Sequence, residues 1–167
     1  MMKLCLWFTL MFVSPEPVYV AYGDTITVSA KSCENLQLLA RLIYCEAGNQ
    51  PMVGKLAVAQ VVMNRQKYFS RLGMKTSIRT VILSKGQFDG VRTKYFYQEP
   101  NQESYDAAFR VLVMEEKVLP ETVLYFANEK IATDKKWLRT IKNEKVVTYH
   151  DHTFYDSKHA IRLYATL

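Results

Sequence analysis

The first regular pattern along the chain is an apolar stripe with helical spacing that stops at a cluster of helix breakers. Apolar residues recur at steps of three and four from Leu36 to Ala47, which is the period of a helix with one buried face. Residues 48–51 follow and include glycine, asparagine and proline, which end helices. The pattern therefore predicts a helix that carries Glu46 in its last turn.

The remaining pattern predicts a mainly helical α+β fold with a small β element. Wide or one-sided apolar faces indicate further helices over residues 52–66, 77–83 and 103–117. Short β-branched and aromatic runs indicate a strand over 123–127 and a strand or a small hairpin over 146–155. Between these elements we expect loops, namely a basic aromatic loop at 67–76, a glycine-bracketed loop at 85–90, an aromatic segment at 91–100 and a basic loop around Trp137.

Length and composition indicate a single globular domain. The chain has 167 residues, of which 49% are hydrophobic and 23% are charged, so it can bury a core and is not a disordered chain. We expect an extended lead-in over 24–35, a domain over 36–156 and a C-terminal tail over 157–167. The net charge of +6 and the pI near 9.2 favour an anionic partner, such as nucleic acid, a membrane surface or an acidic wall polymer.

The N-terminus predicts a secretion signal. Lys3 precedes a short apolar run over 4–13, and Ala21 and Gly23 are small residues at the spacing that a signal peptidase requires. A signal peptide over residues 1–23 places the mature protein outside the cell, in the periplasm or in the cell envelope. It argues against nucleic acid as the partner and against stable membrane insertion after cleavage. The alternative, a membrane anchor, needs a longer apolar span.

Two cysteines remain after signal cleavage, and their state is open. In an oxidising compartment Cys33 and Cys45 either form one disulfide or stay as two buried thiols.

Glu46 is the first candidate for chemistry. A carboxyl group on a last helical turn that is flanked by apolar residues is partly dry, and desolvation disfavours its charged form. Such a glutamic acid holds its proton closer to neutral pH and can act as a general acid. The alternative is a solvated helix-end glutamate with no role.

Several motifs occur in an order that resembles the SleB/CwlJ-type cell wall hydrolases, the spore cortex-lytic enzyme family. The resemblance covers about residues 36–156. The most specific part of the resemblance is the pair of helical motifs that ends at Asn64-Arg65. The later motifs support the resemblance by their order along the chain. The motifs are Tyr44-x-Glu46-Ala47, Gly54-x-x-Ala57-Val58-Ala59-x-Val61-x-x-Asn64-Arg65, Gly86-Gln87-Phe88, Pro120, Leu124-Tyr125-Phe126, Trp137 and His152-x-Phe154-Tyr155.

The resemblance implies a lysozyme-like catalytic domain that acts on peptidoglycan as a lytic transglycosylase, without a cofactor. Members of the family cleave the β-1,4 bond between N-acetylmuramic acid and N-acetylglucosamine, and Glu46 matches their catalytic acid. A hydrolase would need a second carboxylate, about 5–9.5 Å from the first. Many family members have a glutamate where this chain has Gln50, which favours one carboxylate; Asp89, Asp106 and Asp151 remain candidates for a second.

The resemblance also suggests supporting roles. Substrate contacts are expected from Gln87, Phe88, Tyr125, His152 and Tyr155, and bracing of the catalytic helix from Asn64 and Arg65. Phe88 can equally be a plug over the core, Tyr125 a core tyrosine and His152 a structural histidine.

Two rival functions remain. A zinc amidase acting on the same wall would need three protein ligands. His150 and His152, on one face of a strand, could supply two, and His159 or an acidic residue the third. A non-catalytic basic module would use Arg92, Lys94 and the aromatic residues 95–97 as a stacking platform for a polymer.

Overall fold

The structure is a computed structural model that describes residues 18–21, 24–27 and 30–165. The chain divides into two compact units, residues 1–34 and 35–167. In the first unit, strands β1 (Val18–Ala21) and β2 (Asp24–Thr27) form an antiparallel pair. Most of the expected signal peptide, residues 1–17 and 22–23, lies outside the described residues.

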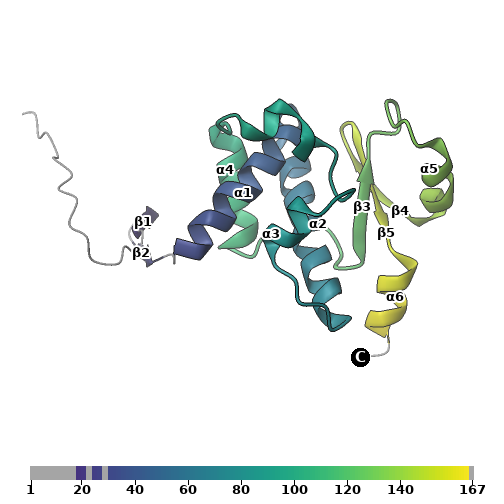
Figure 1. The fold of residues 1–167 in the computed structure, drawn as a ribbon, viewed down its shortest axis with the longest axis horizontal. Helices are drawn as coiled ribbons and strands as arrows, with labels where there is room; N and C mark the ends of the chain where they lie inside the picture. Colours follow the sequence, from purple (N-terminus) through teal and green to yellow (C-terminus); the bar gives the residue numbers. More distant parts are fainter. Residues whose placement is uncertain (1–17, 22–23, 28–29, 166–167) are drawn as a thin grey trace, which may run out of the picture. The chain divides into compact units, whose positions relative to one another are not determined.

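Two long helices follow one another along the chain (Figure 1). Helix α1 (Ala30–Ala47) ends at the predicted residue but begins earlier than predicted, and α2 (Met52–Arg71) begins where the pattern indicates. Helix α2 continues past its predicted end, so the first part of the expected loop at 67–76 is its last turn. No described helix is long and apolar enough to cross a membrane.

Shorter helices complete the helical part. Helix α3 (Ile78–Leu83) is capped by the Ser77 side chain, and two 3-10 turns, η1 (Gly90–Arg92) and η2 (Lys94–Tyr97), occupy the aromatic segment. Helix α4 (Gln102–Leu112) ends before the predicted residue 117. The backbone of Glu115 has a positive φ of 54°, which a continuing helix does not allow.

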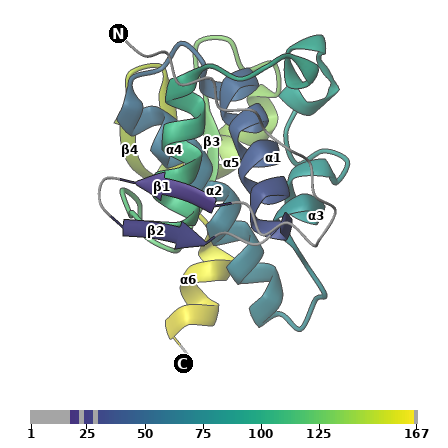
Figure 2. The same ribbon diagram turned by 90° about the vertical axis from the view of Figure 1, so that its left-hand side faces the viewer.

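Three antiparallel strands form the sheet of the second unit in the order β3-β5-β4. They are β3 (Val123–Ala127), β4 (Lys145–Tyr149) and β5 (His152–Asp156), and the predicted hairpin is the β4–β5 pair. Helix α2 packs along β3, and Figure 2 shows β3 and α5 behind α2 and α4.

Two predictions about the last third of the chain need correction. Trp137 lies on helix α5 (Lys135–Ile141) and not in a loop, because the Asp134 carboxylate accepts a hydrogen bond from its backbone N–H at 2.8 Å and caps that helix. A 3-10 turn, η3 (Lys142–Glu144), follows directly, and helix α6 (Lys158–Ala165) lies where no regular element was predicted. The predicted α+β class, mainly helical with a small sheet, is confirmed.

Helix α2 is the central element of the core because two apolar clusters meet on it. One cluster joins α2 to α1, α3 and α4, and the other joins α2 to the sheet. The second cluster consists of Ala47, Ala57, Val58, Val61, Leu119, Val123 and Phe154. It fixes β3 against α2, and truncating a buried ring such as Phe154 to alanine typically costs about 3–5 kcal/mol.

Candidate active site

A cleft of about 850 Å³ opens beside β3. The end of α1, part of α2 and the loop 86–90 line one side, and the segment 128–137 lines the other. The polar or charged residues in its lining are Cys45, Glu46, Arg65, Gln87, Asp89, Asn128, Thr133, Asp134 and His152. The cleft therefore gathers residues from distant parts of the chain around the end of α1.

Glu46 projects into this cleft from the last turn of α1. Its Oε1 accepts a hydrogen bond from the backbone N–H of Gly90 at 2.8 Å. Burial raises the pKa of the Glu46 carboxyl above its ordinary value; the Gly90 N–H opposes that rise, the negative charge of Asp89 adds to it, and the positive charge of Arg65 opposes it. The carboxyl thus keeps its proton to a higher pH than an exposed glutamate does.

Gly90 approaches Glu46 so closely that a side chain at position 90 would clash. A Cβ atom built there would lie 2.5 Å from Glu46 Oε1 and 2.8 Å from Cys45 Sγ. Only glycine lets the backbone N–H reach the carboxylate without displacing it. Sequence reasoning did not single out this residue, although it closes the glycine-bracketed loop.

Arg65 places a buried positive charge beside the loop and β3. Its Nε donates to the Leu124 carbonyl at 2.7 Å, and its Nη1 donates to the Gln87 carbonyl at 2.9 Å and to Gln87 Oε1 at 3.2 Å. The guanidinium lies 4.5 Å from the centre of the Phe88 ring. Burial lowers its pKa to about 10, so Arg65 remains charged at neutral pH.

Asn64 holds the chain at the start of β3. Its Nδ2 donates to the carbonyls of Pro120 at 2.9 Å and Val123 at 3.0 Å. One turn earlier, Gln60 donates to the Leu119 carbonyl at 2.8 Å and accepts from two backbone N–H groups, at 118 and 119. Polar side chains of α2 thus position β3, and with it one wall of the cleft.

Four of the five residues expected to contact substrate line the cleft. They are Gln87, Phe88, Tyr125 and His152. Phe88 is only 6% exposed and packs with the core, which agrees with a plug more than with a stacking surface. Tyr125 meets Trp137 edge to face with ring centres 6.1 Å apart.

His152 and Tyr155, which come from the same strand, differ in their surroundings. His152 is buried against Phe126, and its Nδ1 has no hydrogen-bond partner among the described residues. Burial lowers the pKa of His152, so its ring is neutral at pH 7. Tyr155 does not line the cleft; its ring is 1% exposed and its hydroxyl donates to Glu129 Oε1 at 2.6 Å.

Of the three aspartates considered as a second acid, only Asp89 lines the cleft. Asp106 accepts a hydrogen bond from Gln102 along the exposed side of α4. Asp151 lies in the turn between β4 and β5.

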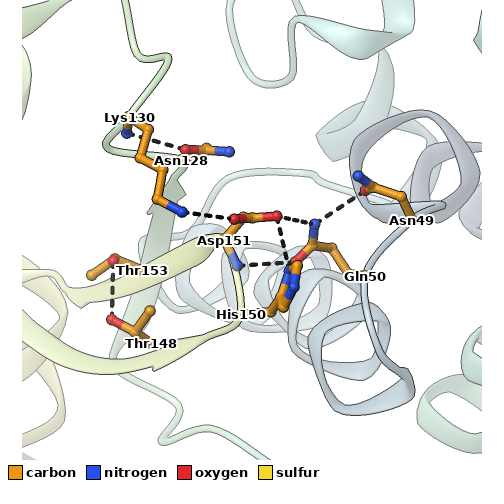
Figure 3. A network of polar contacts seen from close by, with 8 residues as sticks. All are labelled: Asn49, Gln50, Asn128, Lys130, Thr148, His150, Asp151 and Thr153. Carbon is orange, nitrogen blue, oxygen red and sulfur yellow. Dashed lines mark hydrogen bonds and ion pairs between the residues drawn. The ribbon is translucent and has the colours of Figure 1, made fainter.

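Gln50 also lies outside the cleft lining, in a polar network around that turn (Figure 3). Its Nε2 donates to Asn49 Oδ1 at 3.1 Å and to Asp151 Oδ2 at 3.3 Å, and its Oε1 accepts from the Asp151 N–H at 3.2 Å. Lys130 pairs with Asp151 at 3.2 Å. The side chain at position 50 therefore ties the end of α1 to the β4–β5 turn.

The histidines do not have the arrangement that the zinc hypothesis required. His150 lies in the turn with a positive φ of 51°, whereas His152 begins β5, so the two do not share a face of one strand. His159 lies on α6. Within the described part of the chain, no three His, Cys, Asp or Glu side chains are grouped as metal ligands.

The two cysteines among the described residues, Cys33 and Cys45, are free thiols. Cys33 and Cys45 lie on the same helix, and with a rise of about 1.5 Å per residue they are separated by roughly 18 Å along it, too far for a disulfide while α1 is intact. Cys45 lines the cleft, and burial raises the pKa of its thiol to about 12, so it is not a thiolate at neutral pH.

Residues 49–155 match the family model described as Cell Wall Hydrolase. A spore cortex-lytic enzyme of Bacillus cereus is 27% identical over 119 residues, which are 71% of this chain and 44% of that protein. The chain thus spans less than half the length of this curated relative. The matched family region begins just after Glu46.

Two solved structures share the fold. The catalytic domain of the Bacillus cereus SleB protein is 26% identical with a TM-score of 0.62, over 74% of this chain and 91% of that one. The catalytic domain of a germination-specific lytic transglycosylase, SleB from Bacillus anthracis, is 24% identical with a TM-score of 0.64, over 82% of this chain and all of that one.

Proposed function

This chain belongs to the cell wall hydrolase family, and from that premise we propose that it cleaves the glycan strands of peptidoglycan as a lytic transglycosylase. Glu46 is the acid and the base of the reaction. The observation that carries the proposal is a half-buried carboxyl in an open cleft with its pKa raised by burial and one of its oxygens held by the Gly90 N–H.

Glu46 performs two proton transfers in this proposal. Because Oε1 is engaged by the Gly90 N–H, the proton is carried on Oε2, which gives it to the oxygen of the bond between N-acetylmuramic acid and N-acetylglucosamine. The bond from the anomeric carbon to that oxygen breaks. The resulting carboxylate then takes the proton of the muramoyl 6-hydroxyl as its oxygen bonds to the anomeric carbon, which closes a 1,6-anhydro ring and restores the acid.

The surroundings of Glu46 support this cycle. The Gly90 N–H and the nearby positive charge of Arg65 stabilise the carboxylate form, while burial stabilises the protonated form. Because burial and these positive groups act in opposite directions, both protonation states of Glu46 are stabilised, as a group that must both give and accept a proton requires. Gln87, in the same lining, offers its amide N–H groups to an N-acetyl carbonyl, and its Oε1 is anchored by Arg65.

A hydrolytic reaction is the second candidate because Asp89 lies in the same lining. Asp89 would act as the second carboxylate that retaining or inverting glycosidases use. The two reactions differ in their products, since hydrolysis leaves a reducing sugar and transglycosylation leaves an anhydro sugar.

The proposal includes a place of action. A peptidoglycan substrate requires that the protein reach the cell wall, which agrees with the signal peptide expected over residues 1–23. No cofactor is needed for the two proton transfers.

The test is to incubate the purified protein with peptidoglycan and to analyse the soluble products by mass spectrometry. Anhydro-muramoyl ends support the transglycosylase. Reducing ends identify a hydrolase, free stem peptides identify an amidase, and release of no fragment by protein that binds the wall leaves only a binding module.

A further inference from the structure

The excess positive charge of the chain does not lie in the cleft. Among the charged residues that the structure places in the cleft lining, Glu46, Asp89 and Asp134 are acids, and the one base is Arg65. Arg65 is buried and donates to backbone carbonyls, so it is not available to a ligand's acidic group. Cations that could bind an anionic partner therefore lie on surfaces outside the cleft.

Helix α5 has two different sides. Trp137 lines the cleft and contacts Tyr125, and Ile141, one turn later on the same side, is 8% exposed. The opposite side of the helix and of the turn that continues it carries exposed cations at steps of four and three residues, namely Lys135, Arg139 and Lys142. Lys136 is exposed beside them.

Acidic groups neutralise this basic face, which we define as Lys135, Lys136, Arg139 and Lys142, only in part. The charge of Lys142 acts on the Glu129 carboxylate, which also accepts a hydrogen bond from the Tyr155 hydroxyl. The nearest acid that follows in the sequence, Glu144, is already paired with Lys158 at 2.9 Å. Among the described residues, none forms an ion pair with Lys136, Arg139 or Lys142. Lys135 donates a hydrogen bond to the Glu129 carbonyl at 3.1 Å, which helps to hold the start of α5.

We propose that the basic face of α5 binds the carboxylates of the stem peptides that branch from the glycan strand held in the cleft. The inference rests on the proposed function, because it takes peptidoglycan as the substrate. An α-helix with its side chains is about 10–12 Å across. A strand that runs past Trp137 therefore passes within about one helix diameter of the basic face, and its peptide branches can reach that distance.

The charges explain why the cleft would hold the sugars and the basic face of α5 would hold the peptide branches. The sugars of a strand that carries its peptides are uncharged. They do not need cations in the cleft, where Arg65 is the one base and is buried, whereas the peptide branches carry the acidic groups of the polymer. Contacts between exposed charges are weak one at a time and are screened by salt. Several such contacts on one helix add to the binding of the glycan in the cleft, because the peptide branches and the glycan belong to the same peptidoglycan strand.

The test compares full-length proteins that differ on the basic face. The triple variant Lys136→Glu, Arg139→Glu, Lys142→Glu removes cations that form no hydrogen bond or ion pair in the described structure. We expect its affinity for intact, insoluble peptidoglycan to fall by about tenfold at low ionic strength, with a smaller difference at high salt. Turnover of soluble glycan without peptides should match that of the wild type.

A matched control carries the same change of charge elsewhere. Lys75, Lys85 and Arg162 are exposed and lie outside α5, so Lys75→Glu, Lys85→Glu, Arg162→Glu should keep most of the affinity. If both triple variants lose affinity equally, only overall charge matters and the proposal is overturned. If the charge-reversal variant does not fold, the neutral triple variant Lys136→Gln, Arg139→Gln, Lys142→Gln replaces it, with an expected loss of about threefold.

Binding to differently treated peptidoglycan samples identifies which anionic group the basic face of α5 contacts. An amidase removes the stem peptides and leaves one lactyl carboxylate on each muramic acid, on the glycan itself. On that glycan the wild type and the variant should bind equally, and a persisting difference overturns the proposal because it assigns the basic face to carboxylates of the sugars. On walls stripped of phosphate polymers but with peptides intact, the difference should remain, and its disappearance would assign the face to phosphates instead. Binding is read without turnover, so a protein that binds by this face but cuts no glycan would refute the proposed function alone.

Discussion

The backbone N–H of Gly90 donates to Glu46 Oε1 at 2.8 Å, and no residue with a Cβ atom could stand in its place without moving that carboxyl. The contact joins the last turn of α1 to a loop that is distant in the sequence. It orients the carboxyl and leaves one of its oxygens for the substrate. The proposed acid is therefore positioned by backbone rather than by another side chain.

Replacing Glu46 with glutamine should reduce turnover of peptidoglycan by about a thousandfold, because the amide can neither give nor accept the proton. Folding should be intact, and thermal unfolding at pH 7 should occur at the same or a higher temperature. The sign follows from the raised pKa of Glu46: above its unfolded pKa, folding must bury a group that prefers its proton, and glutamine removes that cost.

Asp106→Asn is the matched control for this loss, since Asp106 contacts Gln102 on the exposed side of α4. It should keep wild-type turnover. Product release by Glu46→Gln at the wild-type rate would remove Glu46 from the mechanism.

Gly90→Ala should impair both activity and stability. The new methyl group would overlap Glu46 Oε1 and Cys45 Sγ, so the loop or the carboxyl must shift, at a cost of about 1–3 kcal/mol in unfolding free energy. Turnover and the denaturant midpoint of the purified variant measure the two effects.

Gly73→Ala separates backbone strain from the clash. Gly73 has a positive φ of 75°, and nothing lies within 4 Å of a Cβ built there, so alanine costs about 1–2 kcal/mol through backbone strain alone. If Gly90→Ala and Gly73→Ala have the same unfolding free energy and lose the same activity, the Gly90 N–H does not position Glu46 for the reaction.

Asp89→Asn should shift the pH profile and leave the product unchanged. Activity requires protonated Glu46 and falls as the pH rises through its pKa. Because the charge of Asp89 helps to raise the pKa of Glu46, its removal moves this fall to lower pH. The measurement is kcat/KM against pH, together with the chemistry of the sugar ends.

The same variant distinguishes the two reactions. If the enzyme hydrolyses its substrate with Asp89 as the second carboxylate, Asp89→Asn abolishes turnover at every pH. Retained formation of anhydro ends supports the single-carboxylate cycle.

Gln50→Glu should destabilise the protein without creating a second catalytic acid. The new carboxylate would face Asp151 Oδ2, which Gln50 Nε2 now contacts at 3.3 Å, so like charges would meet in a mostly buried site. These neighbours raise the pKa of the introduced group, and the loss of stability therefore grows as the pH rises through the unfolded pKa of glutamate and disappears at acidic pH.

Unfolding midpoints at pH 4 and pH 8 test this, with Gln102→Glu on the exposed side of α4 as a control that should change little. The products from peptidoglycan should stay those of the wild type. A change from anhydro to reducing ends in Gln50→Glu would mean that position 50 reaches the substrate after all.

Local periodicity in the sequence determined most of the elements that surround the site. The apolar stripe and the breakers at 48–51 placed Glu46 at the end of a helix, and short β-branched and aromatic runs indicated the strands that became β3 and β5. These features depend on neighbours within a few residues, which a single sequence displays directly.

The tertiary structure decided which side chains meet. Gly90 lies 44 residues from Glu46 and Asp151 lies 101 residues from Gln50, so no local pattern reports either contact. It also buried Tyr155 away from the cleft and turned Trp137 into it on a capped helix. Side-chain direction depends on how helices and strands pack, and packing arises from long-range contacts; the sequence therefore determined the elements and the candidate acid, and the folded arrangement determined the chemistry around it.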